Sequence, residues 1–595
     1  MSIDSSQLSV DEILRLATPR SRQYFPPTDE QRAVIEAPLE PLLVVAGAGA
    51  GKTTTMSQRV LYMVAHHGIE PERILGLTFT RKAAGELGLK MRQDLGVLAS
   101  NLGRSFQGDP TALTYNSFAA RILGEYGATI GVDPDSRLIG QAQQVQILTE
   151  IVQNWRGEYP EEDGRYKPTS SIVAAVLALS GHIAEQNMTL DQGAKALRAF
   201  SEELEEIAQS AGKDPTGSLK SMITVNANRI LLLEMARVFE DYKRSHGLID
   251  FSDQLLLATR IVTENASVVR QVRSDYQAVL LDEFQDTSVI QMTFLSALFA
   301  DHPTTAVGDP SQAIYGWRGA SASALSNFLT AFSTPHEAKQ LTLSTAWRND
   351  HAILQAANAV ARPLRGLPRI GQDGGSGSIS IKVPQVKPPV LGPRPQAGEG
   401  EVSASYPLTY QEQLEHVVEF IRQHRVQDEK GKWNTCAVLC RRRADFPAIE
   451  RALKDADIPV QVVGLGGLLD QPSVSDVRAA LELASDPTNA PALMRLVTAM
   501  DIGAADLLIL NQYAKYRARQ GRQVEQEHPD VFLMDAIDQL PPVGWHAPSG
   551  GPSFTAVAHE RLSLLARRLE VIRQGTGRPL DEQIERAMSV LGLRE

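Results

Sequence analysis

The chain has 595 residues, enough for several domains, and its 43% hydrophobic and 22% charged residues are typical of a globular protein. The formal net charge of −11 excludes a chain that is basic throughout, so a nucleic acid would have to bind at a local basic patch. No stretch approaches the roughly 20 apolar residues of a membrane span, and the acidic N-terminus lacks the basic start of a signal peptide. These features predict a cytoplasmic protein without membrane partners.

Residues 1–23 are predicted to be a short leader with an amphipathic turn or two at 10–16. Thr28 follows as the expected N-cap of a helix that begins at Asp29. Gln31 lies in the first turn of that helix, where its amide could both donate to and accept from the edge of an adenine base. On spacing alone, an ordinary surface glutamine is the commoner interpretation.

Residues 42–55 predict a phosphate-binding loop between a buried strand and a helix. Four apolar residues precede alternating glycine and alanine, and Lys-Thr follows. Small residues let the backbone approach a polyphosphate, and free N–H groups at the helix start point at the anion. We expect Lys52 to reach the β and γ phosphates and the Thr53 hydroxyl to hold Mg²⁺. The residues expected to contact the nucleotide here are Ala46, Gly47, Ala48, Gly49, Ala50, Gly51, Lys52, Thr53 and Thr54.

A second predicted strand, 74–80, leads into a helix start at Arg81. Two strand–helix units in succession predict a parallel sheet covered by helices. Phe79, Thr80 and Arg81 lie where strand meets helix, at the edge where open parallel sheets bind ligands. A ring beside cationic groups suits a single nucleic-acid strand, and a solvated basic helix start is the ordinary alternative. Residues 113–118 are a similar, weaker candidate.

Residues 136–245 are predicted to be helical, as an insertion within the first domain, and the sheet pattern returns at 248–253. At 278–286 four apolar residues precede two adjacent carboxylates. In a nucleotide hydrolase the first of them, Asp282, would hold Mg²⁺. Glu283 would orient and deprotonate the attacking water.

The loop after the next predicted strand, which ends at Gly308, carries an amide, two aromatic rings and an arginine. Gln312 is a candidate sensor of the γ-phosphate. Tyr315, Trp317 and Arg318 are candidates for contacting unstacked bases, with each stack contributing about 1–3 kcal/mol. Burial of both rings in the core is the alternative, which the glycine-rich polar surroundings disfavour.

Residues 341–344 predict a further strand, and Trp347 and Arg348 follow it. An arginine beyond the last strand of this domain can reach a bound triphosphate. Such arginine fingers contribute roughly 10³–10⁵ in rate.

In order and spacing, these motifs resemble those of the UvrD-like (UvrD/Rep/PcrA) helicases of superfamily 1 over roughly 24–350. The matching segments are 28–31 for the Q motif, 46–53 for the phosphate loop, 78–84 for motif Ia, 282–286 for motif II and 307–320 for motif III. The resemblance implies that Glu283 is the catalytic base and that Gln312 couples nucleotide to DNA. It also implies that Phe79, Tyr315 and Trp317 contact single-stranded DNA.

Trp347 and Arg348 fall where the family has Tyr-Arg in motif IV. The resemblance therefore implies that Trp347 stacks on adenine and that Arg348 contacts the γ-phosphate. Two residues depart from the family pattern: Ala346 replaces the usual Asn, and Thr54 stands where relatives often have Arg.

The second half is predicted to begin another α/β unit. Residues 371–406 are rich in Gly, Pro and Ser and are predicted to be a flexible loop with one strand, 378–383. Further strands are expected at 436–440, with Cys436 and Cys440 as buried free thiols, and at 460–463. The expected helices are 411–424, 446–456, 474–485 and most of 490–595.

The family's second motor ends with a Thr-x-His-x-x-Lys-Gly motif and an Arg-rich motif, and we find neither between Ala490 and Glu595. About three candidate strands would leave the second sheet incomplete. The expected fold is therefore α/β, with P-loop NTPase, RecA-like motor domains, parallel sheets and two helical insertions, in a chain truncated inside the second motor. The expected domains are a leader 1–23, a first motor 24–350 with its insertion 136–245, the start of a second motor 351–488, and a second insertion 489–595.

The resemblance implies an ATP-dependent 3′→5′ DNA helicase or translocase in DNA repair or recombination, which uses ATP and Mg²⁺ and acts on single-stranded DNA and duplex junctions. One alternative places the same motor in a helicase–nuclease that processes double-strand breaks, with a nuclease or repair-complex partner. Another is an ATP- and DNA-binding module that does not unwind DNA. Intact Lys52, Asp282, Glu283 and Gln312 argue against that module for a whole protein, although not for a fragment.

Overall fold

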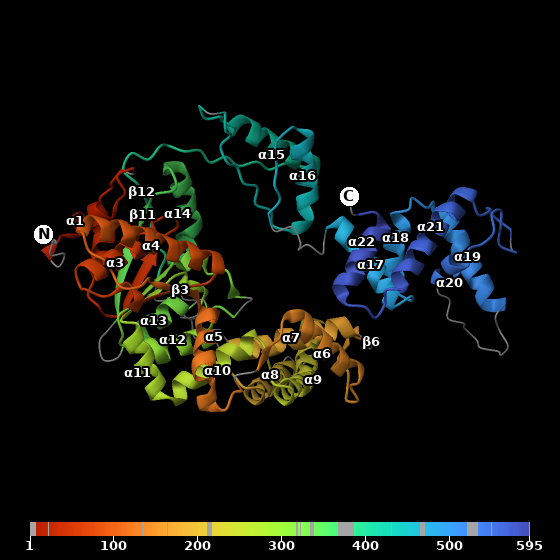
Figure 1. Cartoon of the computed structure of the whole chain (residues 1–595), viewed down its shortest axis with the longest axis horizontal. Coiled ribbons are helices and arrows are strands. Elements are labelled where there is room, and N and C mark those ends of the chain that lie inside the picture. The colour runs from red at the N-terminus through yellow and green to blue at the C-terminus, as the bar shows by residue number, and fades with distance from the viewer. Residues whose placement is uncertain are drawn as a thin grey trace. The chain divides into compact units, whose positions relative to one another are not determined.

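The computed structural model describes residues 7–21, 23–133, 136–162, 165–210, 217–316, 319–321, 323–333, 338–366, 386–429, 431–463, 471–520, 533–548 and 550–593. Its internal contacts divide the chain into two units, Met1–Ser403 and Ala404–Glu595, whose elements are labelled in Figure 1. Within these ranges, no helix has the length and apolar character that crossing a membrane would require.

A six-stranded sheet forms the centre of the first unit. Its strand order is β10-β1-β9-β8-β2-β3, and every neighbouring pair is parallel. The strands are β1 Leu42–Ala46, β2 Ile74–Thr78, β3 Thr111–Thr114, β8 Ala278–Leu281, β9 Thr304–Gly308 and β10 Lys339–Leu343. β1, β2 and β8 are buried along their whole length, which is why they are nearly continuous apolar runs. The predicted α/β fold with a parallel sheet is confirmed.

Helices cover both faces of the sheet (Figure 1). Alternate residues of β1 point to opposite sides, with Leu43 and Val45 in one apolar core and Leu42 and Val44 in the other. The helices on the Leu42 side are α1 Val10–Ala17, α2 Asp29–Ile35, α3 Lys52–Ala65 and α4 Arg81–Leu102. The helices on the Leu43 side are α5 Tyr115–Tyr126, α10 Phe251–Glu264, α11 Ala266–Asp275, α12 Val289–Phe299 and α13 Ala324–Ala331.

The side chain of Arg59, on α3, fixes α2 to this framework. Its Nε donates to Thr305 Oγ1 at 3.0 Å. Its remaining nitrogens donate to the carbonyls of Val34, Ile35, Ala37 and Pro38 at 2.7, 3.2, 2.8 and 3.0 Å. Arg59 is 1% exposed, and burial lowers the pKa of its guanidinium to about 10. Because the last carbonyls of a helix lack partners within it, Arg59 caps the C-terminal end of α2.

Replacement of Arg59 by methionine is expected to destabilise the first unit by about 3 kcal/mol or more, because several buried carbonyls lose their donor. The measurement is the free energy of unfolding from urea denaturation. Arg92→Met, at an exposed position on α4, is the matched control and should change it by less than about 0.5 kcal/mol. A loss below about 1 kcal/mol in the Arg59 variant would contradict the capping role.

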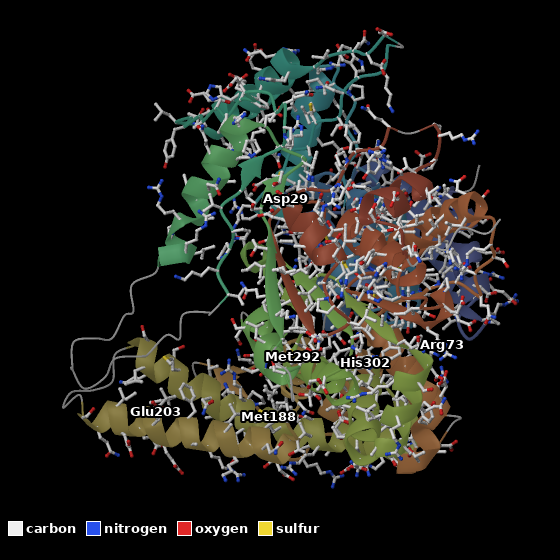
Figure 2. All side chains as sticks on the ribbon, turned by 90° about the vertical axis from the view of Figure 1, so that its left-hand side faces the viewer. Asp29, Arg73, Met188, Glu203, Met292 and His302 are labelled. Atoms are coloured by element: carbon white, nitrogen blue, oxygen red, sulfur yellow. The ribbon has the colours of Figure 1, made fainter. Side chains whose placement is uncertain are left out.

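The predicted insertion is helical in the structure. Its helices are α6 Gln141–Gln153, α7 Thr169–Glu185, α8 Leu190–Ser210 and α9 Gly217–Ser245, and they enclose an apolar core of their own. The one hairpin in its described part joins β5 Glu161–Glu162 to β6 Arg165–Tyr166. Figure 2 shows Met188 and Glu203 on this insertion and Met292 on α12, and α7 contacts both α10 and α12.

The predicted return to the sheet at 248–253 is wrong. β7 Leu248–Ile249 pairs with β4 Arg137–Leu138 in a separate two-stranded sheet, which joins the two ends of the insertion. Asp250 ends the strand because its carboxylate accepts the N–H groups of Ser252 and Asp253 and so starts α10.

The second unit contains the helices predicted for it. They are α15 Tyr410–His424, α16 Phe446–Asp455, α17 Pro472–Ser485, α18 Ala490–Thr498, α19 Ala504–Gln520, α20 Leu533–Asp538, α21 Ala556–Arg573 and α22 Leu580–Leu591. Helices α17 to α22 share one apolar core. The predicted strand 378–383 lies outside the described residues.

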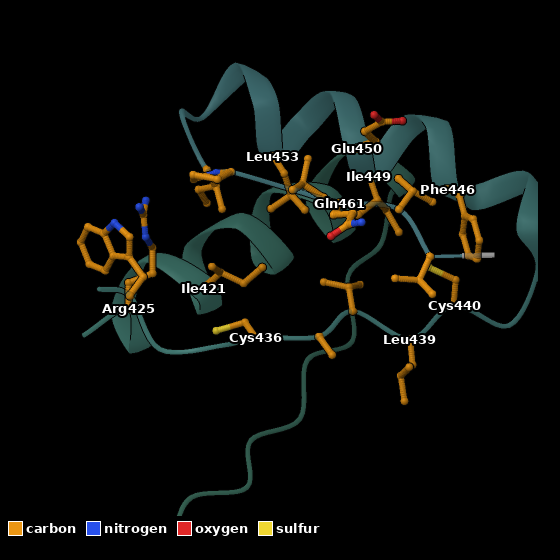
Figure 3. Close-up of a pocket in the computed structure, with 18 of the residues that line it drawn as sticks. Ile421, Arg425, Cys436, Leu439, Cys440, Phe446, Ile449, Glu450, Leu453 and Gln461 are labelled. Carbon is orange, nitrogen blue, oxygen red and sulfur yellow. The ribbon is translucent and has the colours of Figure 1, made fainter. Parts of the chain in front are cut away.

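The strands predicted at 436–440 and 460–463 are absent from these described segments. Both segments instead line a cavity of about 640 Å³ against α15 and α16, shown in Figure 3. An apolar run forms a strand only where a neighbouring strand pairs with its N–H and C=O groups, and neither segment has such a neighbour among the described residues. The expected burial of both thiols is also wrong, because Cys436 is exposed and Cys440 is half-buried.

Candidate nucleotide and DNA sites

The phosphate loop joins β1, which lies between β10 and β9 in the sheet, to the first turn of α3. Gly49 and Gly51 have φ angles of 74° and 80°, in the left-handed region where a side chain is strained. The Gly47 N–H donates to Leu343 O at 3.0 Å, which fixes the start of the loop to β10. Thr53 and Thr54 are exposed in the first turn of the helix. The loop thus presents backbone and hydroxyl groups at a helix N-terminus, as anion binding requires.

The two predicted carboxylates follow β8 and lie beside this loop. Lys52 Nζ is 3.0 Å from Glu283 Oε2. Asp282 is 6% exposed, and burial, reinforced by the charge of Glu283, raises the pKa of its carboxyl to about 6. The structure therefore brings Lys52, Asp282 and Glu283 together from segments more than 200 residues apart in sequence.

Asp282 from this cluster, together with Thr53 and Asp286, fits a Mg²⁺ ion that binds together with a nucleotide. Asp286 Oδ1 is buried and has no hydrogen-bond partner in the described part of the chain. The described part of the chain contains no group of three or more His, Cys, Asp or Glu side chains that could hold a metal alone. Mg²⁺ typically takes one or two carboxylates together with phosphate oxygens and water. Asp282, Asp286 and the Thr53 hydroxyl offer that kind of incomplete protein site.

Mg²⁺-dependent ATP turnover is expected to fall as the pH drops through about 6, because the raised pKa of Asp282 keeps its carboxyl protonated below that value. The apparent Mg²⁺ affinity should weaken about tenfold for each further pH unit. Mg²⁺ titrations of ATPase activity from pH 5 to pH 8 measure this. An Mg²⁺ affinity that stays constant down to pH 5 would contradict the assignment of Asp282.

Gln285 connects the Glu283 carboxylate to Asp309, just after β9, and sequence reasoning assigned Gln285 no role. Its Nε2 donates to Glu283 Oε2 at 2.8 Å, and its Oε1 accepts the Asp309 N–H at 3.0 Å. Gln312 Nε2 in turn donates to Asp309 Oδ2 at 2.7 Å. Gln285 is 2% exposed, so water competes little for these bonds. An unbroken chain of polar contacts therefore runs from Lys52 to Gln312, and we call it the relay.

Gln31 and Trp347 both lie beside Gly51 of the phosphate loop. A Cβ atom built on Gly51 would lie 3.0 Å from Gln31 Nε2 and 3.7 Å from Trp347 Cδ1. Gln31 is 7% exposed, and its Oε1 accepts the Thr28 N–H at 3.1 Å, so it is not the surface glutamine that spacing alone favoured. Its Nε2 remains as the group directed at the loop. The backbone N–H of Trp347 donates to Gly49 O at 2.8 Å.

The side chain of Arg348 begins beside the same loop. A Cβ atom built on Gly49 would lie 2.9 Å from Arg348 Cβ, and the Arg348 side chain is exposed. Trp347 Nε1 is buried and has no hydrogen-bond partner among the described residues. The strand β11 Thr345–Ala346, with its buried Ala346, places this Trp-Arg pair.

On the proposed DNA side, Phe79, which directly follows β2, contacts Tyr315, which lies in the loop after β9. Their ring centroids are 4.8 Å apart with 34° between the planes, and both rings are half-buried. Thr80 caps α4, since its Oγ1 accepts the Ala83 N–H at 3.1 Å, and Arg81 is exposed beside it. The positions of Trp317 and Arg318 lie outside the described residues.

The weaker DNA candidate at 113–118 is wrong for its two rings. Tyr115 and Phe118 are 2% and 0% exposed and belong to the apolar core. The Tyr115 hydroxyl donates to the backbone carbonyl of Asp282 at 2.8 Å, so this ring supports the carboxylate strand from below. Amphipathic helix packing explains the pattern better than base stacking does.

Comparison with known proteins identifies two family domains in the chain. The UvrD/REP helicase N-terminal domain matches residues 27–333, and the UvrD-like helicase C-terminal domain matches residues 341–527. The chain is 25% identical over 488 residues to DNA helicase II of Escherichia coli, which covers 80% of the chain and 57% of that protein. It is 23% identical over 491 residues to the ATP-dependent DNA helicase PcrA of Staphylococcus epidermidis, which covers 82% of the chain and 58% of that protein.

A third relative, the probable DNA helicase II homolog of Mycoplasma capricolum, is 27% identical over 356 residues, which is 59% of the chain and 42% of that protein. The chain thus spans about half the length of the curated relatives it matches. The N-terminal family domain alone covers more than half of the chain and contains the phosphate loop, both carboxylates and Gln312. The chain therefore belongs to the UvrD-like helicase family.

Proposed function

We propose that the chain is an ATP-dependent DNA helicase or translocase that moves 3′→5′ along single-stranded DNA, with Mg²⁺ as its metal, in DNA repair or recombination. The observation that carries the proposal is the relay, because it links the phosphate loop to the loop that bears Tyr315. Family membership supports the direction and the biological role. This activity requires ATP and DNA in one compartment, and we propose that the protein acts in the cytoplasm.

In this proposal Lys52 exchanges partners during the cycle. In the structure its ammonium pairs with Glu283 at 3.0 Å. A triphosphate in the loop offers Lys52 stronger, doubly charged acceptors, so Glu283 is released to orient and deprotonate a water molecule. Asp282 and Thr53 would hold Mg²⁺, which neutralises charge that develops on the phosphates. Arg348, whose side chain begins beside Gly49, would contact the γ-phosphate.

The relay gives this exchange a route to DNA. Gln285 holds both Glu283 and the Asp309 N–H, so a shift of the Glu283 carboxylate changes the bonding of Asp309 and Gln312. Tyr315 lies three residues beyond Gln312 and touches Phe79. A base that stacked on this aromatic pair would feel the state of the nucleotide site, and alternation of that state would move the strand.

Tyr315→Ala tests the proposed DNA contact. Loss of one stacking platform should raise the single-stranded DNA concentration for half-maximal ATPase stimulation roughly tenfold, and should lower the stimulated rate more than the basal rate. Steady-state ATPase titrations with an oligonucleotide measure both values. Tyr406→Ala, at a fully exposed tyrosine in the second unit, is the matched control. Equal losses of stimulated and basal activity would show that Tyr315 is a structural ring, not a DNA contact.

A further inference from the structure

Residues 386–399 form an extended strap that lies against α14, His351–Gly366. At one end Val386 is 3% exposed, and its N–H donates to Ser326 Oγ of α13 at 3.3 Å. In the middle, β12 Gly392–Pro393 pairs in parallel with β11. At the other end, the carbonyls of Gly398 and Glu399 accept the first two N–H groups of α14. The strap is therefore fixed along its length to the first unit.

Two side chains of α14 hold the centre of the strap by its backbone. Asn358 Nδ2 donates to Leu391 O, and Asn358 Oδ1 accepts the Leu391 N–H, both at 2.9 Å. Arg365 donates to the carbonyls of Pro388 and Pro389 at 3.2 and 2.8 Å. Arg365 also donates to Asn358 Oδ1 at 2.9 Å, which orients that amide. Because a proline has no N–H, its carbonyl is its only backbone hydrogen-bonding group, and Arg365 satisfies that carbonyl in both prolines.

The anchored Leu391 touches the phosphate loop. A Cβ atom built on Gly47 would lie 2.0 Å from Leu391 Cδ2 and 3.4 Å from Pro389 Cγ. Gly47 is absent from the glycines with positive φ, whereas Gly49 and Gly51 are among them. A left-handed backbone therefore does not account for glycine at this position, and the three atoms nearest to the built Cβ all belong to the strap. Contact with the strap is thus a second reason for a small residue at position 47, beside the expected approach of the phosphates.

We propose that the strap is a fixed wall of the nucleotide site, with Leu391 and Asn358 as positioning residues for ATP binding. Leu391 fixes the start of the phosphate loop at Gly47. Through β12 and β11 the same segment fixes the residues that precede Trp347 and Arg348. One strap thus sets the spacing between the phosphate side and the Trp-Arg side of the site. The proposal rests on the proposed function, because it assumes that this loop binds ATP.

A double-variant cycle tests the contact. Gly47→Ala should raise the KM for ATP about tenfold, because its methyl group collides with Leu391 and displaces the loop. Gly47→Ala/Leu391→Ala should recover most of that loss, since the new methyl group then has room. Both variants should bind single-stranded oligonucleotide as the wild type does and should show similar melting temperatures. An unchanged KM in Gly47→Ala, or no recovery in the double variant, would overturn the proposal.

Amide hydrogen exchange in the absence of nucleotide gives a readout that does not depend on ATP binding. Leu391→Ala and Asn358→Ala should each speed exchange in a peptide covering residues 42–55 by about tenfold, with no change in a peptide covering α8 and α9 of the insertion. If the wild type failed to bind ATP, the proposed function would fall, while this measurement would still decide the strap. Unchanged exchange at 42–55 in both variants would refute the strap as a support of the loop.

Discussion

Glu283→Gln is expected to bind ATP and to hydrolyse it roughly 10²–10⁴ times more slowly than the wild type. The amide has nearly the shape of the carboxylate, so the hydrogen bond to Gln285 in the relay can persist. The amide cannot, however, accept a proton from water. ATP binding should be retained or tightened, because the Glu283 carboxylate, 3.0 Å from Lys52 Nζ, no longer competes with the phosphates for the lysine. Single-turnover hydrolysis and equilibrium ATP binding, measured side by side, separate the two effects.

The matched control for this variant is Glu264→Gln, at an exposed i,i+4 ion pair with Arg260 on α10. That pair contributes little to stability, and its loss should leave turnover unchanged. A Glu283→Gln variant that turned over ATP within about threefold of the wild type would rule out this carboxylate as the base.

Lys52→Ala is expected to weaken ATP binding about 10²-fold or more and to abolish measurable turnover, since it removes charge-assisted bonds to the phosphates. It also leaves the cluster of carboxylates without its cation. The Lys52 charge lowers the pKa of Asp282 and of Asp286, although burial keeps both raised to about 6. Its loss should therefore push both pKa values higher and shift the acid limb of Mg²⁺ binding to higher pH.

Single-stranded DNA binding should survive in Lys52→Ala and should keep its dependence on salt, because the proposed DNA contact is the Phe79–Tyr315 pair, whereas Lys52 pairs with Glu283. Lys220→Ala, at an exposed position in the insertion, is the charge-matched control and should leave the binding of ATP and of single-stranded DNA unchanged. Normal ATP hydrolysis by the Lys52 variant would show that residues 46–53 are not the phosphate loop of this chain.

Features that depend on neighbouring residues in sequence could be predicted without a structure. The phosphate loop needs only a buried strand, small residues and Lys-Thr at a helix start, and all of these occur within residues 42–55. The inner strands β1 and β8 are buried on both faces and so appear as apolar runs. By contrast, β3 lies at the sheet edge, is only half-buried and carries no comparable run.

Features that depend on distant partners could not be predicted. Arg59 would ordinarily be an exposed helix residue, and its burial follows from carbonyls at the end of α2 that no local pattern announces. Gln285 stands between Phe284 and Asp286 in the sequence, but its role rests on the Asp309 N–H just after β9. The opposite error arose at 436–440, where an apolar run has no neighbouring strand within the described residues.

The strap likewise depends on distant partners, although its composition correctly predicted a loop. Its prolines and glycines predict irregular structure, which the segment has. That Leu391 ends against Gly47 depends on Asn358 and Arg365, which precede it by more than 20 residues. Composition therefore identified a loop, and side-chain hydrogen bonds determined its place.

The affinity of the chain for a fluorescent single-stranded oligonucleotide, measured with and without a non-hydrolysable ATP analogue and Mg²⁺, tests the coupling through the relay most directly. The relay predicts that nucleotide changes the DNA dissociation constant by at least about fivefold, and that DNA changes the nucleotide dissociation constant by the same factor. Identical DNA affinities in the two conditions, with both ligands bound, would contradict the account.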